Sequence, residues 1–325
     1  MSEKLYVGVD ALLGHTPLVQ LKKWATTHNR PDVKVWAKLE SFNPGGSAKD
    51  RTAAAMVKRA REEGKLHEGT PVVESSSGNL GVALARAAVT HAFEFHCVVD
   101  PRANRSTVAY MEALGATVHR VTEPDPETGD WLAARQNRVR ELLRTMDGAI
   151  SFDQYSNEAA FQAHSEGTAA EILEALGHAP DHLFVAVSTT GTVGGCLRTL
   201  RDEPTIVTAV DAEGSVLFGG QRSSRCLPGY GAGVVTALSQ KIQPDNVTRI
   251  APADAIEAAY SLARTEAILP GASGGAVMAA LQQALPELPE GSEVVVVLHD
   301  AGNAYLGTMY NQSWVDENVH VGEQA

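Results

Sequence analysis

Lys49 is the first residue whose type and position suggest chemistry. It follows a glycine-containing loop, 43–48, and precedes a segment, 52–63, that is predicted to be a helix ending at Gly64. The positive end of a helix disfavours a protonated lysine, and a Schiff-base lysine benefits from such surroundings. The glycines also allow the backbone to approach a planar ligand closely. The alternative is a solvated lysine whose charge is offset by Asp50.

Three further loops place hydroxyl groups where predicted helices begin. The first loop consists of Ser75, Ser76, Ser77, Gly78 and Asn79. Its N–H groups and hydroxyls suit a carboxylate or a phosphate, although N-capping by Ser76 or Ser77 explains the pattern equally well. The second loop consists of Ser188, Thr189, Thr190, Gly191 and Thr192, a composition that predicts a phosphate site. Ser273 begins another helix, where a structural cap is the default interpretation.

The second loop also admits a dinucleotide-binding interpretation. Gly191 and Gly194 follow a predicted strand. Asp211 ends the next predicted strand, about twenty residues further on, which is where a dinucleotide-binding fingerprint has its acidic residue. However, Thr189 stands where the first glycine of that fingerprint belongs, and its side chain would crowd a pyrophosphate. A nicotinamide cofactor is therefore disfavoured.

The elements that position these loops alternate between strands and helices. Apolar strands are predicted at 93–99, 183–187, 206–210 and 293–298, and helices at 80–89, 131–146, 193–200, 253–266 and 275–285. This alternation predicts an α/β fold with parallel sheets covered by helices on both faces. Ligands of such sheets bind at the carboxyl ends of the strands, so chemistry is expected in the loops there.

Composition argues against several other classes of protein. Lys and Arg number 27 against 39 Asp and Glu, and the net charge of −12 would repel nucleic acid. No apolar run is long enough to span a bilayer, and the polar N-terminus lacks a signal-peptide core. Cys97, Cys196 and Cys226 lack metal-ligand spacing, so no metal site is expected, and such sparse thiols fit a reducing cytoplasm.

Together, the loops resemble the cysteine synthase family of fold-type II pyridoxal-phosphate enzymes, whose fold is like that of the tryptophan synthase β subunit. The resemblance extends from 13–18 to 300–306. It implies pyridoxal 5'-phosphate as cofactor, a homodimer, and two lobes that each contain a mostly parallel sheet covered by helices. We expect a larger lobe, 1–45 with 151–325, and a smaller mobile lobe, 46–150.

The resemblance also implies roles for the loop residues. Lys49 would hold the cofactor and, once released, remove the α-proton of the substrate. Asn79 would bind the phenolic oxygen of the cofactor, and Ser273 its pyridine nitrogen. The cofactor phosphate would be bound by Ser188, Thr189, Thr190, Gly191 and Thr192. The substrate carboxylate would be bound by Ser75, Ser76, Ser77, Gly78, Asn79 and Gln154.

Within the family, the stretches 77–81, 97–101, 187–191 and 214–219 are most similar to synthases that join O-phospho-L-serine and L-glutamate. Their product, N-(2-amino-2-carboxyethyl)-L-glutamate, is a precursor of 2,3-diaminopropionate in siderophore and antibiotic pathways. Ser188 and Tyr155 stand where ordinary cysteine synthases carry glycine and phenylalanine. Ala301, Ala304 and Gly274 depart from the family's pattern, which leaves the second substrate open.

Arg135 is the candidate cation for the leaving phosphate or for the glutamate side chain, since its guanidinium can bind either anion in bidentate fashion. It is equally well explained as a solvated helix residue beside Arg138 and Arg140. Two other functions remain: a cysteine synthase that uses sulfide and O-acetylserine or O-phosphoserine, and a non-catalytic ligand-binding relative. The intact lysine and phosphate loop oppose the latter. No haem segment or regulatory domain is recognised, which disfavours the cystathionine-forming branch.

Overall fold

The computed structural model describes residues 5–319, which divide into two compact units. The first unit comprises 5–13, Asn43–Gly45 and Lys49–Ala160. The second comprises Gly14–Phe42, Gly46–Ala48 and the described residues from Phe161 onward. Residues 5–13 thus group with the smaller unit, whereas the sequence suggests that they belong to the larger lobe. The second boundary follows Ala160 instead of residue 150.

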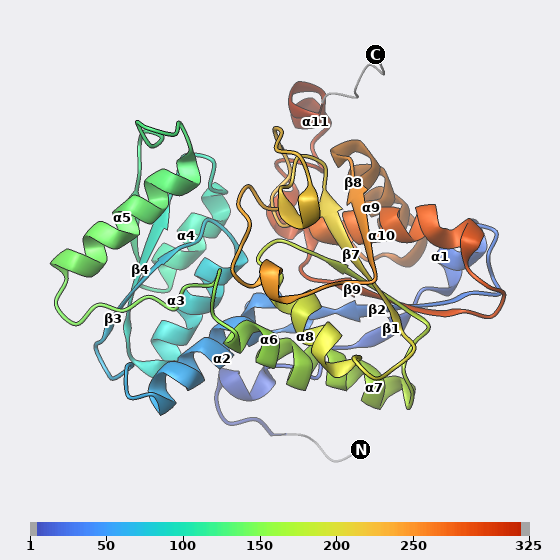
Figure 1. The fold of residues 1–325 in the computed structure, drawn as a ribbon, viewed down its shortest axis with the longest axis horizontal. Helices are drawn as coiled ribbons and strands as arrows, with labels where there is room; N and C mark the ends of the chain where they lie inside the picture. The colour runs from blue at the N-terminus through green and yellow to red at the C-terminus, as the bar shows by residue number, and fades with distance from the viewer. Residues whose placement is uncertain (1–4, 320–325) are drawn as a thin grey trace. The chain divides into compact units, whose positions relative to one another are not determined.

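The first unit is built on three parallel strands in the order β3-β4-β5. They are β3 (Pro71–Ser75), β4 (Glu94–Val99) and β5 (Thr117–Arg120). Its helices are α2 (Lys49–Glu62), α3 (Asn79–His91), α4 (Arg105–Ala113) and α5 (Trp131–Thr145). The sheet alternates its side chains between two faces, so Val73 and Val98 pack under α5, while α3 and α4 cover the opposite face (Figure 1).

The second unit is built on a six-stranded sheet in the order β1-β2-β9-β6-β7-β8. The strands are β1 (Leu18–Gln20), β2 (Lys34–Leu39), β6 (His182–Ala186), β7 (Ile206–Ala212), β8 (Asn246–Ile250) and β9 (Glu293–Leu298). The β1–β2 pair is antiparallel, and the other neighbouring pairs are parallel. The predicted α/β architecture with helix-covered parallel sheets is confirmed.

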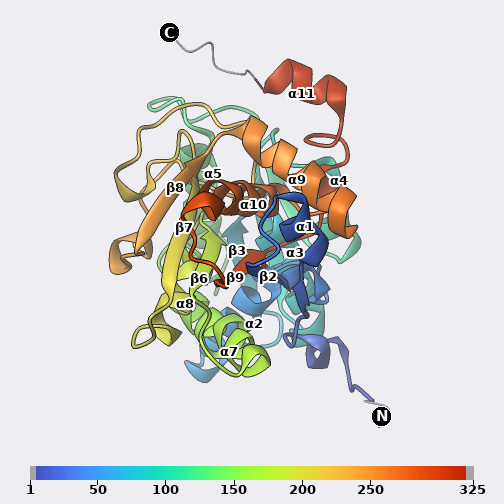
Figure 2. The ribbon, with the colours of Figure 1, turned by 90° about the vertical axis from the view of Figure 1, so that its right-hand side faces the viewer.

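Helices cover both faces of this second sheet (Figure 2). They are α1 (Lys22–Thr27), α6 (Ala159–Ala163), α7 (Ala170–Leu176), α8 (Gly191–Thr199), α9 (Pro252–Glu266), α10 (Ala272–Ala284) and α11 (Gln312–Asn318). The central strand β9 is buried along its length: Val294 and Val296 face α9 and α10, and Val295 and Val297 face α7 and α8. This is why its sequence is continuously apolar and does not alternate.

The observed elements differ from the predicted ones mainly at their ends. The helix predicted over 52–63 begins at Lys49, and the helix predicted from Gly275 begins at Ala272. In both cases the first turn consists of small or polar residues, which carry little apolar periodicity. Among the described residues, no helix is long and apolar enough to cross a membrane.

Candidate active site

Lys49 is the first residue of α2 and is half-buried, not fully solvated. The preceding residue, Ala48, is buried in the second unit, where its N–H donates to the carbonyl of His299 over 2.8 Å. The next residue, Asp50, is 4% exposed and accepts hydrogen bonds from Arg86 Nη1 at 3.0 Å and from the Gly45 N–H at 2.8 Å. The lysine therefore stands on a backbone that is fixed on both sides.

Gly45 serves this arrangement in a way that the sequence did not indicate. A Cβ at this position would collide with the carboxylate of Asp50, so glycine is needed for Asp50 to close the loop. At Gly45 the missing side chain makes room for the Asp50 carboxylate, and this differs from the close approach of a planar ligand that the sequence suggests. Arg86, which pairs with Asp50 from α3, was not recognised in the sequence because 36 residues separate the partners.

The Ser75–Asn79 loop connects β3 to α3 in the first unit, as predicted. Ser76 Oγ accepts the N–H of Gly81 at 2.9 Å, but the N-cap position of α3 is Gly78 and no side chain caps the helix there, so neither Ser76 nor Ser77 is its N-cap. Ser75 Oγ is buried and has no hydrogen-bond partner in the protein. Gln154 Nε2 donates to the carbonyl of Ser75 over 3.0 Å, which brings Gln154 to this loop as expected. An orphaned buried hydroxyl costs free energy unless a ligand binds it, so Ser75 fits a substrate carboxylate.

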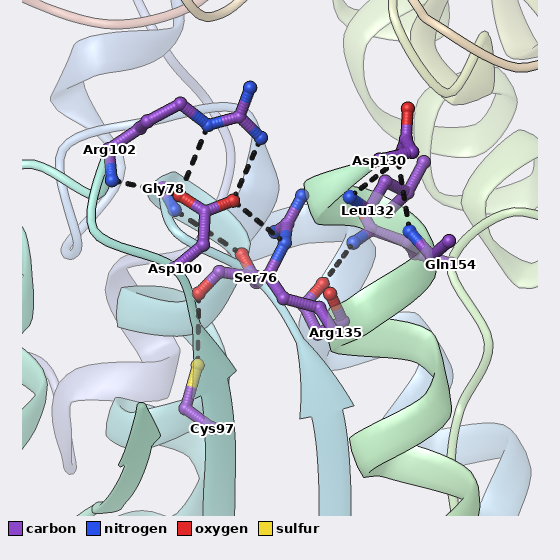
Figure 3. A network of polar contacts seen from close by, with 11 residues as sticks. Ser76, Gly78, Cys97, Asp100, Arg102, Asp130, Leu132, Arg135 and Gln154 are labelled. Carbon is purple, nitrogen blue, oxygen red and sulfur yellow. Dashed lines mark hydrogen bonds and ion pairs between the residues drawn. The ribbon is translucent and has the colours of Figure 1, made fainter. Parts of the chain in front are cut away.

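Arg135 extends from α5 toward Asp100, which follows β4 (Figure 3). Arg135 Nε lies 3.2 Å from Asp100 Oδ2, a distance typical of an ion pair, but it is not aligned for a hydrogen bond. Asp100 is 5% exposed and also binds Arg102, whose Nη2 lies 3.0 Å from Oδ2. Burial tends to raise the pKa of Asp100, but the two arginines outweigh it and lower the pKa.

One carboxylate thus faces two guanidinium groups, of which Arg135 is the less exposed (12% against 63% for Arg102). Tyr155 lies within electrostatic reach of Arg135, and burial raises the pKa of its phenol even though Arg135 lowers it. A neutral phenol donates a hydrogen bond, so Arg135 and Tyr155 together present donors to an anion. The side chain of Arg135 is 12% exposed, and the solvated-helix interpretation is therefore wrong.

Glu74 is a buried carboxyl group immediately before the substrate loop. Its Oε1 accepts a hydrogen bond from Ser151 Oγ at 3.1 Å, and its Oε2 has no hydrogen-bond partner. Burial raises its pKa from 4.5 to about 7, and the nearby charge of Asp153 acts in the same direction. Near neutral pH a large fraction of Glu74 is therefore protonated. The region beside the Ser75–Asn79 loop then carries less negative charge than the sequence suggests.

The Ser188–Thr192 loop lies between β6 and α8 in the second unit, as predicted. Thr190 has a left-handed backbone, with φ of 66°, and no side chain caps the N-terminus of α8. Non-glycine residues adopt this conformation rarely and often at binding sites. The uncapped N–H groups of α8 and the hydroxyls around them form the setting in which a phosphate binds to a helix N-terminus.

Ser273 occupies the first turn of α10 and is 2% exposed. No side chain caps α10, so the default interpretation of Ser273 as a structural cap is wrong. The helix start is instead positioned by Asp300, whose backbone carbonyl accepts the N–H of Gly271 at 3.0 Å and whose Oδ2 accepts the Tyr305 hydroxyl at 2.7 Å. The side chain of Ser273 therefore has no capping role at this helix start.

Gly229–Gly231 connect Ser273 with the phosphate loop inside the second unit. A Cβ on Gly229 would touch Ser273 at 4.0 Å, and the Gly231 N–H donates to the carbonyl of Val187. Both predicted cofactor-binding segments of this unit therefore lie along one edge of its sheet, at the carboxyl ends of β6 and β9. This is the edge where α/β proteins bind ligands.

Comparisons with known proteins agree with this arrangement. The family described as pyridoxal-phosphate dependent enzymes matches residues 9–300. The O-acetylserine-dependent cystathionine β-synthase from Helicobacter pylori superposes with a TM-score of 0.87 at 26% identity, over 94% of this chain and 98% of that one. An O-ureido-L-serine synthase gives 0.86 at 29% identity, over 99% and 98%. A hydrogen sulfide-producing enzyme from Fusobacterium nucleatum gives 0.85 at 28% identity, over 93% and 100%.

The chain belongs to the pyridoxal-phosphate dependent enzyme family. It is a β-replacement enzyme of the cysteine synthase type. From the sequence we expect cystathionine-forming enzymes to carry added domains. This expectation is wrong, because this chain covers 98% of the length of a cystathionine β-synthase.

The residues described above fit the cofactor. The uncapped N-terminus of α8 suits a phosphate dianion, and the buried hydroxyl of Ser273 suits a ring nitrogen. Cys97, by contrast, is inert: it is fully buried, its Sγ donates to the carbonyl of Ser76, and burial raises its pKa to about 12. Bound pyridoxal phosphate supplies an electron sink for the α-carbon of an amino acid.

Proposed function

We propose that the protein joins O-phospho-L-serine and L-glutamate by β-replacement, releasing phosphate and forming N-(2-amino-2-carboxyethyl)-L-glutamate. The observation that carries the proposal is Arg135, a largely shielded arginine (12% exposed) that shares one carboxylate with Arg102 near the neutral phenol of Tyr155. A guanidinium at this position favours a substrate with a dianionic leaving group, and phosphoserine carries about two negative charges near neutral pH. O-acetylserine has a neutral leaving group and would gain no ion pair from Arg135.

In this proposal some of the predicted residues bind the cofactor and others bind the substrates. Lys49 holds the cofactor and accepts the α-proton, Asn79 and Ser273 orient the ring, and Ser188–Thr192 bind its phosphate. The Ser75 hydroxyl and the backbone beside it receive the substrate carboxylate, and Gln154 supports that loop through its hydrogen bond to the Ser75 carbonyl. Arg135 and Tyr155 bind the leaving phosphate or the side-chain carboxylate of glutamate. We also propose a cytoplasmic homodimer.

A cysteine synthase is the second candidate, and the O-acetylserine-dependent neighbour favours it. Mass spectrometry of products separates the two functions. Phosphoserine and O-acetylserine are each offered glutamate, sulfide and ammonia in competition. We expect the glutamate adduct from phosphoserine as the main product. Cysteine as the main product from either donor would overturn the proposal in favour of the cysteine synthase.

A further inference from the structure

His164 is a fully buried histidine of the second unit that contacts the phosphate loop. It begins a π-helical segment, His164–Ala169, between α6 and α7. Its Nε2 lies 3.3 Å from Thr192 Oγ1, and its Nδ1 lies 2.9 Å from Thr168 Oγ1. The imidazole therefore joins a hydroxyl of the π-helical segment to a hydroxyl of the loop. Single π-helical turns inside helices are frequent at functional sites.

The packing around His164 holds it against the loop. A Cβ on Gly195 would lie 2.6 Å from His164 Cβ and 2.6 Å from the carbonyl oxygen of Phe161, so α8 lies directly on the π-helical segment. The imidazole is itself fully buried and contacts a hydroxyl through each nitrogen, which restricts its rotation. Its two nitrogens therefore have fixed partners, and the remaining freedom is which of them carries the proton.

The direction of the hydrogen bonds follows from the charge of the ligand. A phosphate dianion accepts hydrogen bonds, so the hydroxyl of Thr192 serves it only if its hydrogen points to the phosphate. Thr192 Oγ1 must then accept from His164, which requires a hydrogen on Nε2. In the neutral ring Nδ1 is then an acceptor and takes the hydrogen of Thr168 Oγ1. The hydroxyl of Thr168, the Nε2–H of His164 and the hydroxyl of Thr192 then donate in sequence, each toward the phosphate.

We propose that His164 is a positioning residue that orients the Thr192 hydroxyl toward the cofactor phosphate through an Nε2–H tautomer fixed by Thr168. This proposal rests on the assignment of Ser188–Thr192 to that phosphate. The opposite tautomer would take the hydrogen of Thr192 and turn a lone pair toward the phosphate, which weakens binding. His164 thus affects the phosphate and not the ring of the cofactor.

The first experiment compares two ligands of the apoenzyme, pyridoxal 5'-phosphate and pyridoxal, which lacks the phosphate. His164→Leu is expected to raise the Kd for pyridoxal phosphate about tenfold, as for the loss of one hydrogen bond to a charged group, and to leave the Kd for pyridoxal unchanged. His164→Gln, which retains an N–H donor, is expected to recover most of the affinity. Equal Kd values of His164→Leu and the parent for pyridoxal phosphate, or equal weakening of both ligands, would overturn the proposal.

Ser165→Ala is the matched control. Ser165 Oγ lies 2.8 Å from Thr199 Oγ1, so this pair joins the same two helical segments without touching the phosphate loop. Its loss is expected to leave both Kd values unchanged. Thr192→Val tests the underlying assignment: if this variant binds pyridoxal phosphate like the parent, the loop assignment itself fails. If Thr192→Val weakens binding and His164→Leu does not, only the role of His164 fails.

A second measurement needs no disruptive change at His164. Nitrogen-15 NMR of the holoenzyme with labelled histidine reports the tautomer of His164, assigned through the conservative variant His164→Gln. We expect the neutral Nε2–H form in the parent and an increased Nδ1–H population in Thr168→Val, which lacks the hydroxyl donor. An Nδ1–H ring in the parent holoenzyme would overturn the proposal.

Discussion

Arg135 and Arg138 lie on the same helix and form a matched pair for mutation. Arg135 is buried beside Asp100, whereas Arg138 is more exposed and pairs with Glu141 on α5 at 2.7 Å. Arg135→Ala is expected to lower kcat/KM for phosphoserine roughly ten- to a hundredfold, the effect of losing a charge-assisted hydrogen bond to a dianion. Arg138→Ala is expected to change it by less than about twofold, because exposed ion pairs contribute little.

Steady-state kinetics with purified holoenzyme measure this difference, and the visible absorbance of the bound cofactor serves as the check on loading. Both variants should retain the cofactor, since neither arginine belongs to the proposed cofactor-binding residues. Equal kcat/KM values for phosphoserine in Arg135→Ala and the parent would show that Arg135 does not bind the leaving phosphate, and an equal kcat/KM for glutamate as well would exclude both proposed roles.

Glu74 gives a prediction for the pH dependence of stability. Its pKa is raised from 4.5 to about 7, so between these pH values the folded protein holds a proton that the unfolded chain releases. The contribution to stability is complete below pH 4.5 and is lost as pH rises through about 7, a change of about 3 kcal/mol. Glu74→Gln remains neutral and should lack this loss.

Urea unfolding of the parent and of Glu74→Gln at pH 4.5 and pH 8 measures the effect. The parent should lose about 3 kcal/mol more unfolding free energy than the variant between these pH values. Glu68→Gln, at an exposed position, should follow the parent. Parallel pH profiles for the parent and Glu74→Gln would mean that the carboxyl group of Glu74 is not perturbed by burial.

At the scale of elements, the contact between α8 and the π-helical segment determines how the phosphate loop is held. Gly195→Ala would place a Cβ 2.6 Å from His164 Cβ, and such overpacking typically costs about 1–3 kcal/mol. Thermal unfolding should show a lower Tm for this variant. Gly307→Ala is the control, because its Cβ would meet nothing within 4 Å. A parental Tm for Gly195→Ala would show that the two segments can separate without cost.

The sequence predicted the elements that carry a strong local signal. The valines of β9 and the hydroxyl-rich start of α8 were located because burial on both faces and a helix N-terminus each leave a short-range pattern. The edge strand β8, whose sequence is Asn-Val-Thr-Arg-Ile, is not predicted because three of its five residues are polar. Its pairing with β7 depends on the whole sheet and not on its own residues.

The site residues, too, can be predicted only where a local sequence pattern marks them. The Ser188–Thr192 loop and Ser273 could be named from local composition, but His164 could not, because its partner Thr192 is 28 positions away. Likewise, nothing near Arg135 in the sequence distinguishes it from Arg138, and the difference arises only when β4 brings Asp100 next to α5. Contacts between residues this far apart in the sequence depend on the topology of the fold, which local sequence patterns do not encode.

At the scale of the whole molecule, we predict a homodimer. Several large apolar side chains of the described residues are exposed, among them Leu5, Val7, Phe42 and Val89. Sedimentation equilibrium at micromolar concentration should give twice the 34.4 kDa mass of one chain. A mass that stays at one chain over the micromolar range would show that these side chains serve another purpose or none.

The central claim is that Lys49 holds pyridoxal phosphate. Borohydride reduction of the holoenzyme, followed by proteolysis and mass spectrometry, fixes the cofactor to the lysine that carries it and identifies that residue. We predict pyridoxyl modification of Lys49 and none of Lys58, an exposed lysine on the same helix. Lys49→Ala should lose the modification together with turnover. Modification of a different lysine in the parent enzyme would contradict the assignment of the active site.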